Sequence, residues 1–234
     1  MIEAEWWEYE DAGEFAEAVA GDVGFIIESA LDARGEALIA IAGGRTPFAA
    51  YQKLAAQKLK WKNVTIVPTD DRLVPVTDKL SNVAGLAKIF LPLGARVVPL
   101  TAEGADDYRA AGKAADARLG SLKWPPDLVL LGMGADGHTA SIFPGADLDE
   151  ALNGPKTRLA LGVRPDPLPP EAPVDRVTLS KAAILSARAI SIIVTGAEKK
   201  DVLERAINQG QSSPYPIGRV LADAEQAIDI HWAA

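Results

Sequence analysis

The sequence predicts an α/β fold in which helices flank a largely parallel central sheet. Short apolar runs of strand length alternate along the chain with longer segments whose apolar residues recur at helical spacing. The chain of 234 residues is 48% hydrophobic, which is enough to fill a substantial core. Because no fixed-period repeat and no shift in composition marks a boundary, we expect residues 1–234 to form a single domain.

The first half of the chain predicts three strand–helix units after an edge strand at residues 3–9. Residues 13–33 predict a helix because apolar side chains fall on one of its faces. These side chains are Phe15, Val19, Val23, Ile26, Ile27 and Ala30. The next expected elements are a strand at 36–42, a helix near 47–59, a strand at 64–67, a helix at 81–91 capped by Ser81 or Asn82, a strand at 96–100 and a helix at 105–119.

The second half continues the alternation around a proline-rich segment. Its expected elements are strands at 127–131, 158–163, 176–180 and 190–195, a helix at 198–207, a polar loop at 209–216 and a last strand at 227–232. The segment RPDPLPPEAPVD at 164–175 holds five prolines and must be a loop. It is either a lid over a binding site or a plain surface connection.

Charge and composition exclude several classes of function. The formal net charge is -8 and no run of Lys or Arg offers a stripe for nucleic acid. The absence of cysteine excludes disulfides and thiolate metal sites, and the two distant histidines argue against a histidine-rich metal site. The acidic N-terminus is not a signal peptide and no apolar run is long enough to span a membrane, so we expect a cytoplasmic protein.

A glycine motif follows the strand expected at 127–131. The stretch LVLLGMGADGHTASIFPG at 128–145 places Gly132, Gly134 and Gly137 in the G-x-G-x-x-G spacing of a dinucleotide-binding turn. Such a turn should open a long helix, but Pro144-Gly145 stops any helix here. No carboxylate stands about 20 residues downstream for a ribose, so the glycines need another explanation.

The same motif supplies the candidate base. His138 follows Gly137 at the carboxyl end of a strand, and an imidazole is the usual side chain for taking a proton near neutral pH. Asp136 either orients His138 or braces the turn. His231 lies in the last expected strand and is interpreted as structural.

Three further loops at the carboxyl ends of expected strands carry charge. Gly43, Gly44, Arg45 and Thr46 precede a helix, with Thr46 as its expected cap and Pro47 in its first turn, which suits a phosphate cradle or an ordinary turn.

Asp70, Asp71 and Arg72 form a charge cluster that is either functional or a solvated turn. Lys199 and Lys200 begin a helix, where cations are unfavourable unless an anion binds there; otherwise they are solvated surface lysines.

Together these residues resemble the 6-phosphogluconolactonases, which share a superfamily with the glucosamine-6-phosphate deaminases. The matching segments are AGGRTPFAAYQKL, TDDRLVPVTDKLSNVAGL, LVLLGMGADGHTASIFPG, DRVTLSKAAIL and IIVTGAEKKDVL, in this order. The pattern GMGxDGHTASxFPG is typical of the lactonases, whereas the deaminases resemble DGHIAFNEPG. The resemblance implies a Rossmann-like, glucosamine-6-phosphate deaminase-like fold.

The resemblance also implies a reaction: hydrolysis of 6-phospho-D-glucono-1,5-lactone to 6-phosphogluconate in the oxidative pentose phosphate pathway, with no cofactor or metal. His138 is then similar to the histidine that activates water. The substrate-binding residues implied are Gly43, Gly44, Arg45, Thr46, Asp70, Arg72, Gly134, Gly137, Arg176 and Lys199. We expect the backbone amides around Gly134 to Gly137 to stabilise the oxyanion, and a small-molecule enzyme that is a monomer or weak homodimer.

The sequence leaves two other functions open. One is a deaminase-like isomerase, although Ser141-Ile142-Phe143 stands where the deaminases carry an Asn-Glu pair. The other is a non-catalytic sugar-phosphate sensor, which would need neither His138 nor a catalytic water. Many relatives read G-G-S-T-P and D-E-R where this chain has Arg45 and Asp71, so the sequence leaves open which cations contact the phosphate.

Overall fold

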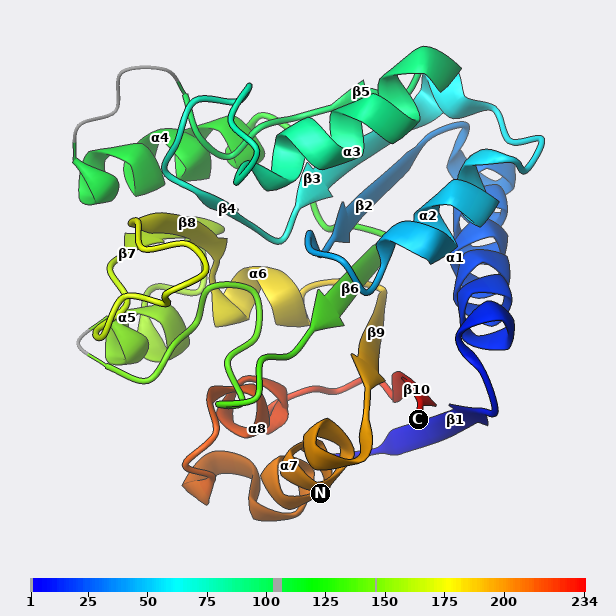
Figure 1. Ribbon diagram of the computed structural model, residues 1–234. Helices are drawn as coiled ribbons and strands as arrows, with labels where there is room; N and C mark the ends of the chain where they lie inside the picture. The colour runs from blue at the N-terminus through cyan, green and yellow to red at the C-terminus, as the bar shows by residue number, and fades with distance from the viewer. Residues whose placement is uncertain (1, 103–106, 146) are drawn as a thin grey trace.

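The computed structural model describes residues 2–102, 107–145 and 147–234, and its centre is a seven-stranded sheet. All strand pairs in this sheet are parallel, in the order β1-β10-β9-β6-β2-β3-β5 (Figure 1). The strands are β1 (Ala4–Tyr9), β2 (Ala37–Ile41), β3 (Val64–Pro68), β5 (Arg96–Val97), β6 (Leu128–Gly132), β9 (Ala189–Thr195) and β10 (Ile228–Ala233). The predicted parallel α/β fold and the edge position of the first strand are confirmed.

Helices cover both faces of the sheet, which is why its central strands are apolar throughout. All five residues of β2 are buried, for example. The helices are α1 (Ala12–Arg34), α2 (Phe48–Ala55), α3 (Asn82–Phe90), α4 (Tyr108–Gly120), α5 (Leu148–Asn153), α6 (Lys181–Leu185), α7 (Ala197–Gln209) and α8 (Pro216–Leu221). One core cluster packs α1, α2 and α3 against the sheet, and the other packs α4, α6, α7 and α8.

A second, smaller sheet was not predicted. It is antiparallel, in the order β4-β8-β7, with β4 (Asp70–Arg72), β7 (Ala160–Val163) and β8 (Arg176–Leu179). The sequence does indicate strands at 158–163 and 176–180, but not that they leave the main sheet. The cluster Asp70–Arg72 was expected in a loop and instead forms the edge strand of this sheet, because β3 continues past Thr69 toward β8.

Several element boundaries also differ from the predictions. Helix α2 ends at Ala55 instead of near 59, β5 has two residues instead of five, and residues 105 and 106 of the expected α4 lie outside the described chain. Helix α5, helix α6 and helix α8 were missed because each is only five or six residues long, too short for a periodic pattern. In the described part of the chain no helix is long and apolar enough to cross a membrane.

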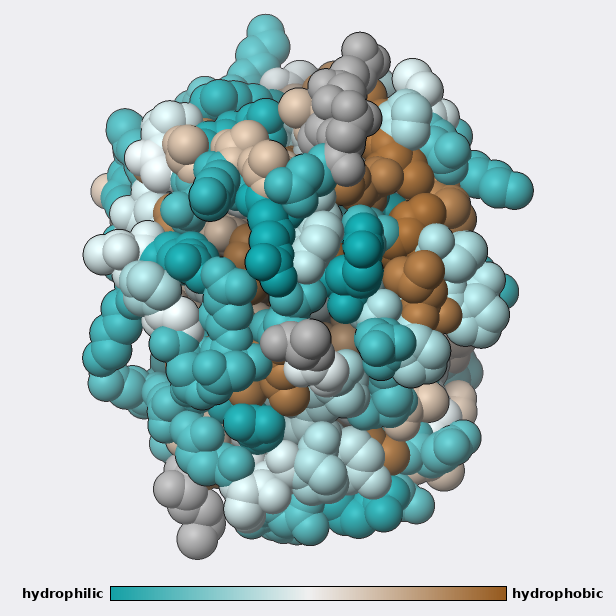
Figure 2. All heavy atoms as spheres, turned by 90° about the vertical axis from the view of Figure 1, so that its left-hand side faces the viewer, coloured by the Kyte–Doolittle hydropathy of each residue, from teal (hydrophilic) through white to brown (hydrophobic). Residues whose placement is uncertain are grey.

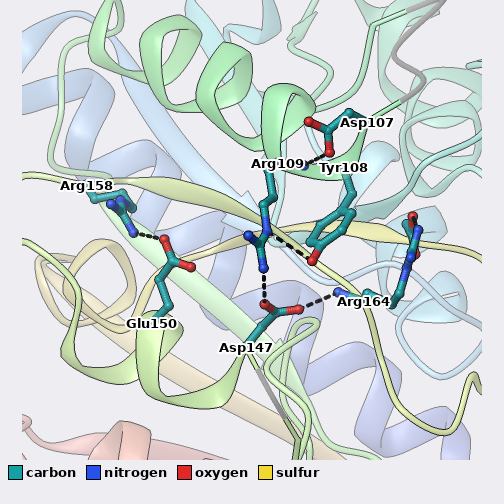
Figure 3. Close-up of polar contacts among 8 residues, drawn as sticks. Asp107, Tyr108, Arg109, Asp147, Glu150, Arg158 and Arg164 are labelled. Atoms are coloured by element: carbon teal, nitrogen blue, oxygen red, sulfur yellow. Dashed lines mark hydrogen bonds and ion pairs between the residues drawn. The ribbon is translucent and has the colours of Figure 1, made fainter.

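A group of ionic contacts joins α4 to α5 and to the strand β7 (Figure 3). The Asp147 carboxylate accepts a hydrogen bond from the Arg164 backbone amide at 2.8 Å and lies 3.9 Å from the Arg109 guanidinium. Arg109 and Arg164 both lie over the Tyr108 ring. The face that carries α4, α5 and β7 is mostly hydrophilic in Figure 2, with hydrophobic atoms in separate patches.

Asp71 ties β4 to the first turn of α3. Its carboxylate is fully buried and accepts hydrogen bonds from the backbone amides of Arg72, Asn82 and Val83 at 2.6 to 3.1 Å and from the Ser81 hydroxyl at 3.2 Å. Ser81 in turn caps α3, as predicted, by accepting from the Ala84 amide. One buried carboxylate thus fixes the strand and the helix relative to each other.

The packing of α4 on β7 predicts the effect of a single methyl group. A Cβ at Gly112 would lie 1.9 Å from the backbone nitrogen of Gly162, whereas a Cβ at Gly120, at the end of the same helix, meets nothing within 4 Å. We expect Gly112→Ala to lower the free energy of unfolding by about 1–3 kcal/mol, despite the better helix propensity of alanine. Urea denaturation measures this, with Gly120→Ala as the matched control that should be neutral or stabilising. Equal stability of the two variants would contradict the close contact.

Asp71 predicts a pH dependence of stability. Burial raises the pKa of Asp71 from 3.8 to about 6, against the lowering effect of its backbone hydrogen bonds. Between these two pH values the folded protein retains a proton that the unfolded chain has released, so this group's contribution to stability falls as pH rises from about 4 to about 6. Asp71→Asn should remove that component, measured as the difference in urea midpoint between the two pH values. Asp201→Asn, at an exposed position of α7, is the control; an unchanged difference in Asp71→Asn would contradict the assignment.

Candidate active site

A pocket of about 320 Å³ opens where β2, β3, β6 and β9 end. Ligands of open parallel sheets bind at this carboxyl edge, and the small sheet closes one side of the pocket here. The pocket is lined by ten residues that the sequence singled out: Gly43, Gly44, Arg45, Thr46, Asp70, Arg72, Gly134, His138, Arg176 and Lys199. Five segments far apart in sequence therefore meet at one place.

Two predicted site residues do not line this pocket. Asp136 lines a neighbouring pocket of about 560 Å³ that shares His138 and Phe143 with the first. Gly137 is buried within the turn, and a Cβ added there would lie 2.6 Å from the Tyr215 side chain. Both residues shape the turn that carries His138.

His138 is held by its own turn. Its Nδ1 lies 2.5 Å from Asp136 Oδ1, and its backbone amide donates to the same oxygen at 3.1 Å. The charge and hydrogen bond of His138 outweigh the effect of burial and lower the pKa of Asp136. A carboxylate at Nδ1 favours the tautomer with the proton on Nδ1, which leaves Nε2 as the acceptor. Asp136 contacts both the imidazole and the backbone amide of His138, so its position is compatible with orienting the ring and with bracing the turn.

Glycine is required at two positions of this turn. A Cβ at Gly134 would lie 2.2 Å from the His138 ring, so only glycine lets the imidazole fold back over the strand end. Gly137 has a φ of 75°, a left-handed conformation that glycine adopts without strain. Phe143 then stacks on the His138 ring with 4.1 Å between the ring centroids. These contacts explain Gly134 and Gly137 without a dinucleotide.

Two of the backbone amides expected to donate to an oxyanion already donate hydrogen bonds within this turn. The Gly134 amide donates to the His138 carbonyl at 2.9 Å, and the Gly137 amide donates to the Gly134 carbonyl at 3.0 Å. The Gly134 and Gly137 amides are therefore not free to face a ligand, because the tight turn that presents His138 uses them internally. For the amides of Ala135 and Asp136, between these two glycines, the role of oxyanion donor stays a prediction.

Free amides occur instead in the loop after β2. Within the described chain, the backbone amides of Gly43, Gly44, Arg45 and Thr46 donate no hydrogen bond, although all four residues line the pocket. The predicted cap at Thr46 is wrong, since Pro47 occupies the N-cap position of α2 and no side chain caps it. Successive free amides at the start of a helix form a concave site for an anion.

Two arginines face each other across the small sheet. Arg72 and Arg176 are directly paired in the antiparallel register of β4 and β8. Arg72 Nη1 donates to the Leu80 carbonyl at 2.8 Å and to Asn82 Oδ1 at 3.1 Å, while its buried Nε has no partner among the described residues. Like charges directly opposite each other are unfavourable unless an anion is shared between them.

Arg176 is almost fully buried and fixed by the proline-rich loop. Its Nη2 donates to the Ala172 carbonyl at 3.0 Å, and its guanidinium lies 5.6 Å from the centroid of the Phe143 ring. Burial lowers the pKa of Arg176, with an opposing effect of Asp70 and a further lowering effect of Arg72. The loop at 164–175 also contributes Glu171 to the pocket wall.

The two lysines at the start of α7 have different environments. Lys199 lines the pocket. Lys200 instead pairs with Glu8 at 2.5 Å and lies 4.3 Å from the centroid of the Trp232 ring. The prediction that a lysine at the start of α7 meets a bound anion therefore applies to Lys199 and not to Lys200.

Three residues that support the site were not assigned to it from sequence. Asn82 holds Arg72, Phe143 stacks on His138, and Ser141 donates to the buried Asp70 carboxylate at 2.5 Å. Asn82 stood out only as a possible helix cap, and Ser141 and Phe143 only as part of a motif. The partners of Asn82 and Ser141 come from distant segments, so no local pattern reveals those two contacts. His231, interpreted as structural, is buried and bonded to the Tyr9 hydroxyl through Nδ1 at 2.9 Å.

Comparison with known proteins agrees with this geometry. Residues 10–232 match the family model described as glucosamine-6-phosphate isomerases/6-phosphogluconolactonase. A 6-phosphogluconolactonase of Rhizobium meliloti is 37% identical over 229 residues, covering 96% of this chain and 97% of the relative.

Solved structures extend the likeness to the fold. A 6-phosphogluconolactonase from Shewanella baltica superposes with a TM-score of 0.91 at 30% identity, covering 99% of this chain and 98% of that one. A monomeric glucosamine-6-phosphate deaminase, 20% identical with a TM-score of 0.78, shares the fold over 98% of this chain and 97% of its own. By its sequence and its architecture, this chain belongs to the glucosamine-6-phosphate isomerase/6-phosphogluconolactonase family.

Proposed function

We propose that this protein hydrolyses 6-phospho-D-glucono-1,5-lactone to 6-phosphogluconate. The observation that carries the proposal is that one pocket brings His138 together with a cationic wall, formed by Arg45, Arg72, Arg176 and Lys199. A lactone needs a positioned water, a base near neutral pKa and donors for the oxyanion. The names of the relatives support the same activity.

In the proposed mechanism, His138 acts first as a base and then as an acid. Nε2 takes a proton from a water molecule while the water oxygen attacks the C1 carbonyl carbon. The tetrahedral intermediate collapses by breaking the bond between C1 and the ring oxygen, and the imidazolium returns the proton to that oxygen. Asp136 stabilises the imidazolium through Nδ1. The reaction needs no covalent nucleophile, because water attacks the carbonyl directly.

In this proposal the protein holds the substrate mainly by its phosphate group. Arg45, Arg72, Arg176 and Lys199 line the pocket with the free amides of the loop after β2. The unpartnered Nε of Arg72 supports a bound anion, since a buried donor costs about 1–3 kcal/mol when it has no acceptor. Binding energy from the phosphate then holds the carbonyl near His138.

A deaminase-like isomerization is less well supported by the same pocket. Ser141 is committed to Asp70, and Phe143 is stacked on His138, so the segment that carries an Asn-Glu pair in the deaminases supplies no second acid–base group here. We further propose that the enzyme acts in the cytoplasm, in the oxidative pentose phosphate pathway, without a cofactor. Its state as a monomer or weak homodimer stays a prediction.

The first test removes the base. We expect His138→Ala to lower kcat by about 10² to 10⁴ while the affinity for 6-phosphogluconate changes little. The lactone is made in situ with glucose-6-phosphate dehydrogenase, the dehydrogenase is removed, and lactone disappearance is followed after subtraction of the spontaneous rate. Calorimetry of 6-phosphogluconate binding is the control, since an unchanged affinity shows that the variant is folded and that its phosphate-binding residues are intact. An unchanged kcat would exclude His138 as the base.

The second test compares neighbouring lysines. Lys199→Ala should weaken 6-phosphogluconate binding by about tenfold to a hundredfold, because a charge-assisted hydrogen bond to phosphate is worth roughly 1.5–3 kcal/mol. Lys200→Ala removes the same charge one residue away, outside the pocket, and should bind the product like the wild type. Arg45→Ala should behave like Lys199→Ala. Equal affinities of the two lysine variants would remove Lys199 from the phosphate site.

A further inference from the structure

A second pocket of comparable size lies at the opposite edge of the sheet. Its volume is about 380 Å³, and it is formed where β2, β3, β5 and β6 begin. The side chains that matter here are Arg34, Arg96, Lys123, Trp124, Asp127 and Arg188. The candidate active site does not use any of them.

The lining of this pocket carries more positive than negative charge. Four cations and two carboxylates, Glu36 and Asp127, line it, whereas the whole chain has a formal net charge of -8. Lys123 and Glu36 form a pair at 2.5 Å and cancel each other. The excess comes from three arginines: Arg34 and Arg188, which both contact Asp127, and Arg96 at the start of β5.

Asp127 neutralises only part of that charge. Its nearly buried carboxylate pairs with Arg34 and lies 3.4 Å from Arg188 Nε, with both arginines on the same oxygen, Oδ1. Its other oxygen accepts the Leu38 amide at 2.9 Å. One carboxylate thus holds two guanidinium groups in place, and both remain partly exposed.

Arg96 adds a further cation. It is the first residue of β5, is exposed, and makes no ion pair or side-chain hydrogen bond with any residue in the ranges described. Arginine donors held in a fixed orientation recognise phosphate oxygens in pairs. Arg34 and Arg188 are held in this way by Asp127, and the excess positive charge of the lining suits a doubly charged phosphate group.

Trp124 gives the pocket a flat apolar wall beside these cations. Its Nε1 donates to the Ser186 hydroxyl at 2.8 Å, which fixes the half-buried indole ring, and Leu122 and Pro125 line the pocket next to it. A planar ring on the ligand would stack on such a surface.

We propose that this pocket binds a phosphate monoester that carries a planar ring, such as a nucleoside monophosphate. The phosphate is held by Arg96 together with Arg34 and Arg188, and the ring lies against Trp124. Because the parallel strands separate this pocket from the candidate active site by the length of β2, at roughly 3.3 Å per residue, the two ligands bind without competing.

Calorimetric titration with adenosine monophosphate tests the proposal. The wild type should bind with a Kd below about 1 mM, both alone and with saturating 6-phosphogluconate. Arg96→Glu should weaken this binding by at least about tenfold. Lys113→Glu makes the same charge change at an exposed position of α4 and should leave it intact.

A second probe separates the ring from the phosphate. Trp124→Leu should weaken binding of adenosine monophosphate more than binding of inorganic phosphate. The proposal is overturned if the wild type gives no saturable heat, if Arg96→Glu and Lys113→Glu weaken binding equally, or if 6-phosphogluconate displaces the nucleotide. The last result would assign the nucleotide to the candidate active site. Arg72→Ala distinguishes the two sites independently, since it should retain nucleotide binding.

Discussion

The pairing of Arg72 with Arg176 across the small sheet is the constraint on which the candidate site depends. Two guanidinium groups in direct register repel each other, and the strands would separate unless neighbouring groups compensated for the charge. The buried carboxylates of Asp70 and Asp71 provide part of that compensation. Carbonyl groups and Asn82 accept hydrogen bonds from the arginines and fix their directions. What remains is a positive wall with an unsatisfied donor, which an anion completes.

The same sheet is linked to the base on the other side of the pocket. Ser141, three residues after His138, donates to Asp70 in β4, so the turn and the cationic wall share a hydrogen bond. Phe143 stacks on the His138 ring and also lies under the Arg176 guanidinium. These two contacts hold His138 in place relative to Arg72 and Arg176 before any ligand binds. Catalysis by positioning depends on this kind of preformed geometry.

The sequence predicts those parts of the molecule that local patterns encode. The main sheet follows from apolar runs between amphipathic segments, and the meeting of Arg45, Arg72, His138 and Lys199 follows from their positions after successive parallel strands. The small sheet was missed because β4 has a charged sequence, and only burial against β8 and α3 makes it a strand.

Contacts between distant loops could not be predicted from the sequence for the same reason. The amides of Gly134 and Gly137 were expected to face a ligand because glycines commonly do so, but a closed turn uses them internally. Which amides are free depends on backbone geometry that residue types do not encode.

Charge also explains how the proposed reaction would release its product. The lactone enters with its negative charge confined to the phosphate, which the cationic wall attracts. Ring opening adds a carboxylate at C1, beside His138 and within reach of the field of Asp136, whose pKa is lowered and which therefore stays ionised at neutral pH. Repulsion between these two carboxylates weakens product binding at one end while the phosphate end is unchanged. Cations that attract the phosphate, combined with an ionised Asp136 beside His138, would thus favour the substrate over the product it forms.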